Sequence, residues 1–399
     1  MTGYAIPKRA WWNLALATLA FAVNFWAWAL LSPLAPQYQD KMGLSAVQTS
    51  LLIAIPVIVG SLGRIPIGAL TDRYGGRLMF TMVSFTTVMP VVFLAFASNY
   101  WAVIAGGFVL GLGGTTFAIG VPHVNAWFPA ARRGLALGIF GIGTGGTAIA
   151  ALATPRITEN VSRQAAFLVV AMALALVGTL CFFTMQSSPS WQKSVARMSD
   201  KLKAAKSLRI TWELAALYAV TFGGYVALSN YLPTYLRGDY GLTVADASAR
   251  MAGFVALAVV ARPIGGWLAD RIGGKRVLMG SLGLIGLFAI VAAFHASLTP
   301  VATIAFFGLA VGVGAGAGAV FALVSQTVPT ARVGAVTGFV GAMGGLGGFI
   351  PPLLMGFIDQ ATGTYAIGFM LLSDVAFASL VFTWVKLHKG TKEQEAKSS

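Results

Sequence analysis

The chain has 399 residues, of which 57% are hydrophobic and only 10% are charged, whereas soluble domains carry about 25% charged residues. This composition excludes an ordinary soluble domain and predicts an integral membrane protein whose surroundings are the lipid bilayer. The formal net charge of +15 does not indicate a nucleic-acid partner, because the basic residues cluster in short connections between apolar runs.

Apolar segments near the ~20 residues needed to cross ~30 Å of hydrocarbon recur along the whole chain. The first is interpreted as a retained span and not as a signal peptide, because it is long and lacks a clear small-residue cleavage site. We therefore predict an all-α membrane protein of twelve transmembrane helices. The predicted limits are 11–34, 48–69, 79–98, 101–122, 134–154, 165–185, 211–233, 248–269, 277–296, 300–324, 334–357 and 364–386.

The distribution of basic residues predicts the orientation of these spans. An even number of spans places both termini on one side of the membrane. Lys8 and Arg9 precede the first span, and further lysines and arginines fill the longest loop and the tail on the same side. The positive-inside rule makes that side cytoplasmic. We expect a multi-pass protein of the cell inner (plasma) membrane with both termini in the cytoplasm.

The two halves of the chain repeat one another across a central polar stretch. GRIPIGALTDRYGGR at 63–77 corresponds to ARPIGGWLADRIGGKR at 261–276, with an offset of 198 residues. Parallel repeats of six spans that enclose a midplane site are typical of secondary transporters, so the repeat predicts alternating access. The predicted division is an N-terminal six-helix bundle over 1–190, a cytoplasmic linker over 191–210, a C-terminal six-helix bundle over 211–388 and a cytoplasmic tail over 389–399.

The repeated loops resemble the loop between the second and third spans of the major facilitator superfamily, and here the motif recurs between spans eight and nine. The resemblance implies the major facilitator fold, with two pseudo-symmetric six-helix halves. An aspartate near a helix end can pair with arginine and cap a neighbouring helix, and the glycines permit a tight turn. We interpret the charged residues of these loops as conformational latches and not as ligands: Asp72, Arg73, Arg77, Asp270, Arg271 and Lys275.

Two arginines lie inside apolar spans. Arg64 and Arg262 each precede a loop aspartate by eight residues, which places them about 12 Å inward from the cytoplasmic side. A lipid-facing arginine near mid-bilayer costs at least ~2.5–3.5 kcal/mol, so both side chains should face the space between the halves. The spans that line the cavity in this superfamily contain no interior Asp or Glu here. Two buried cations without a counter-ion predict an anion site.

Three glycine-rich segments indicate which family of the superfamily the chain resembles. GLGGTTFAIGVPHVNAWFP at 111–129, GIFGIGTGGTAIAALATP at 138–155 and GFVGAMGGLGGFIPPLLMG at 338–356 resemble signatures of the nitrate/nitrite porter family. Such glycines let helices approach closely and slide. Together with the two arginines, the resemblance covers nearly the whole chain. It implies a secondary transporter of a small inorganic oxyanion, nitrate and/or nitrite, that works by exchange or proton symport.

The resemblance also implies the residues of the site. One arginine from each half, Arg64 and Arg262, clamps the planar anion, because a guanidinium presents a rigid fork to planar oxyanions. Aromatic side chains flank the anion, and the backbone of the glycine-rich segments lies close to it. The matching positions are Phe117, Tyr218, Phe222, Gly143, Gly345 and a first-span tryptophan, either Trp26 or Trp28.

Thr144 departs from the family pattern, because family members commonly have asparagine at this position. Threonine donates one hydrogen bond where the amide donates two. Nitrate, nitrite, cyanate and a small carboxylate therefore stay open as substrates. Energy coupling also stays open: Asp374 is the one evident intramembrane carboxylate and His123 can titrate near neutral pH, but we expect a structural role for both.

Other classes of function fit the sequence less well. An enzyme needs a nucleophile, a metal or an acid–base constellation, and a chain with three histidines, one cysteine and no clustered carboxylates is expected to have none. We likewise expect no metal and no other cofactor. A transporter-derived membrane receptor is the non-transport alternative, but its signalling domain would not fit the short loops and tail. We expect the protein to be a monomer.

Overall fold

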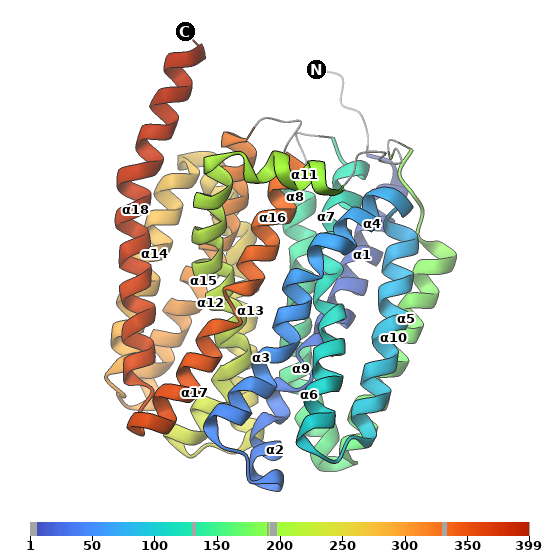
Figure 1. Cartoon of the computed structure of the whole chain (residues 1–399), viewed down its shortest axis with the longest axis vertical. Helices are drawn as coiled ribbons and strands as arrows, with labels where there is room; N and C mark the ends of the chain where they lie inside the picture. Colours follow the sequence, from blue (N-terminus) through green and yellow to red (C-terminus); the bar gives the residue numbers. More distant parts are fainter. Residues whose placement is uncertain (1–5, 130–132, 190, 192–197, 329–332, 399) are drawn as a thin grey trace.

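The computed structural model of the chain describes residues 6–129, 133–189, 191, 198–328 and 333–398. Over these residues the regular elements are helices that run between two ends of an elongated bundle, and both termini lie at the same end (Figure 1). We call this the terminal end and the other the opposite end. Each of the twelve predicted spans falls on a helix or on a pair of stacked helices, as expected from the length and polarity of the apolar segments.

The first six spans are mostly broken helices. Glycine-rich 3-10 turns interrupt the fourth and fifth spans, where the missing side chains let neighbouring helices approach. The elements are α1 (Lys8–Trp28) with η1 (Ser32–Leu34) and α2 (Ala35–Met42); α3 (Ala46–Leu62) with α4 (Arg64–Tyr74); α5 (Gly76–Phe96); α6 (Tyr100–Leu110) with η2 (Gly111–Thr115) and α7 (Thr116–Trp127); α8 (Arg133–Gly141) with η4 (Ile142–Gly145) and α9 (Gly146–Asn160); and α10 (Arg163–Thr184).

The last six spans contain longer continuous helices. The elements are α12 (Arg209–Tyr240), α13 (Val244–Ile272), α14 (Gly274–Ala293), η5 (Leu298–Ala302) with α15 (Thr303–Thr327), α16 (Val333–Leu346) with α17 (Ile350–Thr362), and α18 (Ala366–Ser398). Among the described residues, eleven helical stretches are long and apolar enough to cross a membrane. The remaining span is α12, which has 32 residues and carries more polar side chains.

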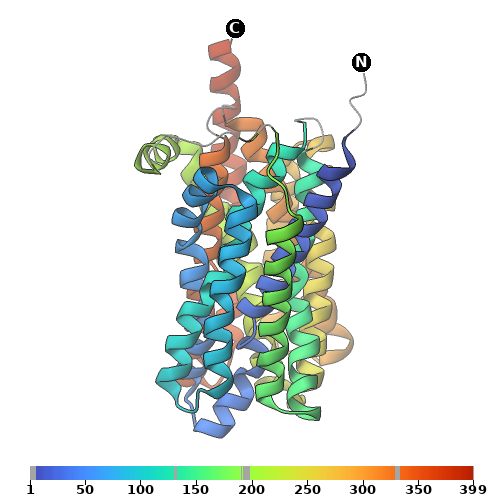
Figure 2. The same ribbon diagram turned by 90° about the vertical axis from the view of Figure 1, so that its right-hand side faces the viewer.

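Two polar segments contain more helix than the sequence alone indicated. The linker predicted over 191–210 includes the short helix α11 (Met198–Lys206), which lies across the terminal end in Figure 1. Helix α18 continues past the predicted end of its span at 386 as far as Ser398 and projects beyond the bundle (Figures 1 and 2). Neither segment has the apolar length that marks a span, so hydropathy gave no signal for them.

The internal repeat is visible in the backbone. Gly75 and Gly273, which are 198 residues apart, both adopt positive φ angles, of 84° and 94°. Each separates two helices at a tight turn, α4 from α5 and α13 from α14. Only glycine adopts such angles without steric cost, which explains the first glycine of the Gly-Gly pair in each repeated loop.

The two repeats pack along a long interface. Helix α13 packs on α8 and α9, while α3 packs on α16 and α17. Polar contacts join the repeats near the opposite end: Ser50 Oγ donates to Tyr231 Oη at 3.3 Å, and Arg237 pairs with Asp40 at 2.5 Å. The predicted arginines lie between these helices, on α4 and α13.

Candidate functional site

Arg64 is held between the two repeats. It occupies the first turn of α4 and is only 2% exposed. Its Nε donates to the carbonyl of Gly114 at 3.3 Å, and its Nη1 donates to the carbonyl of Gly341 at 2.6 Å. Its Nη2 is buried without a hydrogen-bond partner among the described residues. The guanidinium therefore touches both repeats and keeps one nitrogen unsatisfied.

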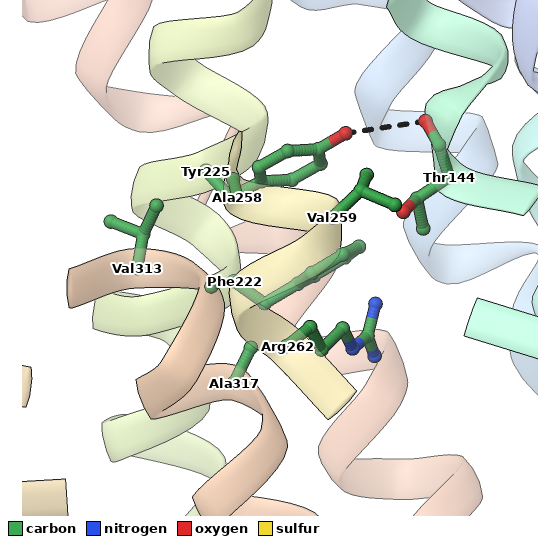
Figure 3. Close-up of a pocket in the computed structure, with 9 residues that line it drawn as sticks. Thr144, Phe222, Tyr225, Ala258, Val259, Arg262, Val313 and Ala317 are labelled. Carbon is green, nitrogen blue, oxygen red and sulfur yellow. Dashed lines mark hydrogen bonds between the residues drawn. The ribbon is translucent and has the colours of Figure 1, made fainter. Parts of the chain in front are cut away.

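Arg262 reaches the same region from α13. Its side chain is partly buried, and Nη2 donates to the hydroxyl of Tyr218 at 2.9 Å. Figure 3 shows this guanidinium extending from the helix beside Phe222. Ion pairs between described residues include Arg209 with Glu213, Arg237 with Asp40 and His295 with Asp239, and within that part of the chain neither Arg64 nor Arg262 has a carboxylate partner.

Two phenylalanine rings flank both guanidinium groups. The Arg64 Cζ lies 5.3 Å from the ring centre of Phe117 and 5.4 Å from that of Phe222. The Arg262 Cζ lies 5.7 Å and 5.3 Å from the same two centres. Cation–π attraction at these distances offsets part of the cost of burying positive charge. The structure therefore brings Arg64, Arg262, Phe117 and Phe222 together in one cluster, and their role in binding stays a prediction.

Further aromatic rings extend this cluster. Tyr218 stacks on Phe222 with ring centres 5.0 Å apart, as the i, i+4 spacing indicated. Phe321 was not predicted, yet its ring lies 5.8 Å from Arg262 Cζ and 5.9 Å from the centre of Phe117. The residue stands in an ordinary apolar stretch of the tenth span, so no sequence signal distinguishes it from core packing.

A narrow cavity adjoins Arg262. Its volume is about 10 Å³, near the lower limit for holding one water molecule. The polar lining comes from Thr144, Tyr225 and Arg262, and Phe222 closes one wall. The rest of the lining is small and apolar: Ala258, Val259, Val313, Gly314 and Ala317. A larger solute needs these side chains to move apart, as a rocking motion of the repeats would allow.

Thr144 does not present a free hydroxyl proton to this cavity. Its Oγ1 donates to the carbonyl of Gly141 at 2.8 Å, within its own helix. Tyr225, which the sequence analysis missed, donates from Oη to the carbonyl of Thr144 at 3.2 Å and lies 3.0 Å from Thr147 Oγ1 (Figure 3). Tyr225 thus joins the second repeat to the broken fifth span.

The first-span tryptophans hydrogen-bond to the second and fifth spans, and a binding role for either stays a prediction. Trp28 Nε1 donates to the carbonyl of Pro56 at 3.0 Å, and Trp26 Nε1 donates to Thr154 Oγ1 at 3.0 Å. The first-span ring next to Phe117 is Phe21, with ring centres 6.0 Å apart. Sequence reasoning missed Phe21 because a helix with so many aromatic residues leaves the register of the inward face open.

The two predicted glycines have different surroundings. A Cβ at Gly143 would lie 2.5 Å from Phe21 Cδ1, so this glycine lets the fifth span pack against the first. A Cβ at Gly345 would collide with Ser61 Oγ and lie 3.3 Å from Arg64 Nη1. Gly345 therefore lies in the immediate surroundings of Arg64, whereas Gly143 allows the fifth span to pack closely against Phe21 of the first span.

Comparison with known proteins places this arrangement in a family. The chain matches the model of the Major Facilitator Superfamily over residues 17–252 and 214–399. It is 44% identical to a protein of Mycobacterium tuberculosis named probable nitrate/nitrite transporter NarK2, over 94% of this chain and 96% of that one. It is 39% identical to the nitrite extrusion protein of Bacillus subtilis, over 97% of both chains. The chain belongs to the nitrate/nitrite porter family of the major facilitator superfamily.

A solved structure of low sequence identity shares the fold of this porter. A bacterial homologue of the human lysosomal transporter Spinster, in an inward-facing and occupied conformation, superposes with a TM-score of 0.70. The match covers 96% of both chains at 18% identity. The comparison confirms the major facilitator fold predicted from the repeated loops.

The repeated loops of the porter contact the last helix of their own repeat. Arg77 Nε donates to the carbonyl of Phe182 on α10 at 2.9 Å, and Lys275 Nζ donates to the carbonyl of Trp384 on α18 at 3.0 Å. The other two loop arginines lie over rings: Arg73 Cζ is 5.5 Å from the ring centre of Tyr74, and Arg271 Cζ is 4.1 Å from that of Trp267. A latch role for these cations and for Asp72 and Asp270 stays a prediction.

The two titratable residues considered for coupling lie outside the arginine cluster of the porter. His123 is buried in α7, with its ring against Gly76 and 6.3 Å from the ring centre of Phe80. Asp374 is exposed on α18, at the edge of the bundle in Figure 1. Within the described chain neither residue contacts Arg64 or Arg262, and a structural role for both stays a prediction.

Proposed function

We propose that this porter carries nitrate and nitrite across the cell inner membrane by alternating access, with Arg64 and Arg262 binding one anion between them. The observation that carries the proposal is the shared position of the two guanidinium groups. One comes from each repeat, both lie over Phe117 and Phe222, and neither has a carboxylate partner among the described residues. Two adjacent positive charges in a site of low polarity favour an anion.

The chemistry of the groups selects a small planar oxyanion. A guanidinium donates parallel N–H bonds to a pair of oxygens, which matches nitrate and nitrite. The rings of Phe117 and Phe222 flank both guanidinium groups, and flat apolar faces of this kind suit a planar anion. Cyanate is linear and presents no pair of oxygens, and a carboxylate larger than formate carries an additional carbon group. Both are therefore expected to compete weakly with nitrate.

Transport requires the two repeats to rock about the bound anion. The contacts near the opposite end must break when that end opens, including the Arg237–Asp40 ion pair and the Ser50–Tyr231 hydrogen bond. Passing through the closed state without an anion leaves the two cations desolvated and uncompensated, so the empty porter should resist the change. This argument favours exchange of one anion for another, and proton symport is the alternative mechanism.

The proposed membrane arrangement follows the positive-inside rule. Both termini and α11 lie at one end of the bundle, which we place in the cytoplasm because the loops and tail there are rich in lysine and arginine (Figure 1). The six-helix units are the N-terminal bundle over 1–190 and the C-terminal bundle over 211–388. A monomer is the proposed working unit, because a single chain supplies both arginines.

Counterflow in proteoliposomes tests the proposed function. Vesicles loaded with nitrate or nitrite should take up external labelled nitrate, whereas empty vesicles and vesicles loaded with cyanate or acetate should take up much less. Arg64→Lys and Arg262→Lys should lose this uptake, and Arg156→Lys is the control because Arg156 is exposed and bonds only to the carbonyl of Leu152 among its hydrogen-bond partners in the described chain. A wild-type protein that binds nitrate but exchanges none would favour the receptor alternative.

A further inference from the structure

Ser61 has a buried hydroxyl that no protein group satisfies. It lies near the end of α3, is 0% exposed, and its Oγ makes no hydrogen bond among the described residues. Many buried hydroxyls donate to a carbonyl one turn earlier, as Thr87 does to Val83 at 2.7 Å and Ser229 to Val226 at 3.1 Å. Thr211, Thr234 and Ser248 share the unpaired state of Ser61 among the described residues, but Ser61 is the one of these that lies three residues from Arg64. A buried donor left unpaired destabilises a fold, so Ser61 calls for a partner.

The side chain with the unsatisfied hydroxyl and the side chain of Arg64 both border Gly345. Ser61 and Arg64 are three residues apart around the short break at Gly63, a spacing that places side chains on one helix face. Gly345 touches both, since a Cβ there would collide with Ser61 Oγ and lie 3.3 Å from Arg64 Nη1. Ser61 Oγ and Arg64 Nη2, both buried and without a partner in the described chain, therefore belong to two side chains that border the same glycine of α16.

We propose that Ser61 is a further anion-binding residue, whose hydroxyl donates a hydrogen bond to an oxygen of the anion held by Arg64. This inference rests on the proposed function and adds a residue to its site. An oxyanion accepts several hydrogen bonds at once, and a hydrogen bond to a charged acceptor is stronger than one between neutral groups. Binding of the anion gives both unpaired donors a hydrogen-bond acceptor. The free-energy cost of burying them unpaired is then removed, which favours the anion-bound state.

This assignment explains how the site manages with Thr144 in place of an amide. The Thr144 hydroxyl proton is engaged by the Gly141 carbonyl, so the fifth span offers the anion no side-chain donor from this residue. Ser61 supplies a neutral donor from the second span instead. The donor set of the site then consists of two guanidinium groups and one hydroxyl, with none of them committed to a carboxylate in the described part of the chain.

The test compares Ser61→Ala with Ser229→Ala in the purified full-length porter. Nitrate dissociation constants and thermal unfolding with and without nitrate are measured on each. Ser61→Ala should raise the nitrate Kd roughly ten- to hundredfold, the equivalent of one hydrogen bond to a charged group. Without nitrate it should unfold at the same or a higher temperature than wild type, because the unpaired donor is gone. The nitrate-induced rise in unfolding temperature should shrink.

The control should behave in the opposite way. Ser229 donates to its own helix, so Ser229→Ala should leave the nitrate Kd within about twofold and lower the unfolding temperature without nitrate. If Ser61→Ala does not yield folded protein, Ser61→Cys provides the measurement, because a thiol is a weak donor of similar size and should give an intermediate Kd.

The outcomes separate the two levels of the proposal. A wild-type nitrate Kd in Ser61→Ala, or in Ser61→Cys where only that variant folds, overturns the role of Ser61 and leaves the transport proposal intact. A lower unfolding temperature of Ser61→Ala without nitrate, combined with an unchanged Kd, shows a packing role and also overturns it. Wild-type protein that binds neither nitrate nor nitrite refutes the proposed function itself.

Discussion

Replacing Arg64 by lysine should weaken anion binding while leaving the porter folded. Lysine keeps the positive charge but not the planar fork, so it cannot hold the Gly114 and Gly341 carbonyls and an anion oxygen at the same time. The loss of one hydrogen bond to a charged group is about 1.5–3 kcal/mol, which raises the nitrate Kd about 10- to 150-fold. Counterflow at nitrate concentrations near the wild-type Kd should then disappear.

The assay is nitrate binding to purified Arg64→Lys by calorimetry, followed by counterflow in proteoliposomes. Size-exclusion profiles and unfolding temperatures without nitrate establish that the variant is folded. Arg156→Lys is handled in parallel and should bind nitrate as the wild type does, because Arg156 is exposed on α9. A folded Arg64→Lys protein with wild-type nitrate affinity would refute the reasoning, since a point charge would then suffice and the fork would have no role.

Three other substitutions test neighbouring parts of the account. Thr144→Asn should keep transport active and lower the nitrate Kd about two- to tenfold, since the amide adds a donor; a folded variant with weaker binding would show that packing fixes this position. Tyr225→Phe should lower the free energy of unfolding by about 1 kcal/mol, measured by denaturation, because it removes the hydroxyl that joins the repeats; an unchanged value would contradict this. Asp374→Asn should leave nitrate/nitrite counterflow nearly unchanged when the pH gradient is collapsed. Net nitrate uptake that is driven by a proton gradient in the wild type and lost in this variant would contradict the exchange mechanism.

The spans and the fold could be predicted from the sequence because they depend on local and repeated patterns. Apolar length marks each crossing, and the turn glycines of the repeated loop, Gly75 and Gly273, adopt the same positive φ. The short helix α11 and the helical extension of α18 could not be predicted in this way, since both are polar and hydropathy marks only lipid-crossing segments.

The site could be predicted only in part. Arg64 and Arg262 could be identified from the sequence because a charged side chain inside an apolar span is costly and usually marks a functional site. Phe321, Tyr225 and Phe21 were missed because each reaches the site by packing against helices that are far away in the sequence. An aromatic residue in a span usually belongs to the packed core, so its presence alone is no signal. Ser61 was missed because its distinguishing property is a missing hydrogen bond, which exists only once α3, α4 and α16 are placed together.

The central claim is that Arg64 and Arg262 hold one anion between them. A double-mutant cycle tests it most directly, with nitrate binding measured on wild type, Arg64→Lys, Arg262→Lys and the double variant. If one anion bridges both forks, the loss of binding free energy in the double variant should differ from the sum of the single losses by at least about 0.5 kcal/mol. Losses that add within about 0.3 kcal/mol would place the two arginines at independent sites and contradict the account.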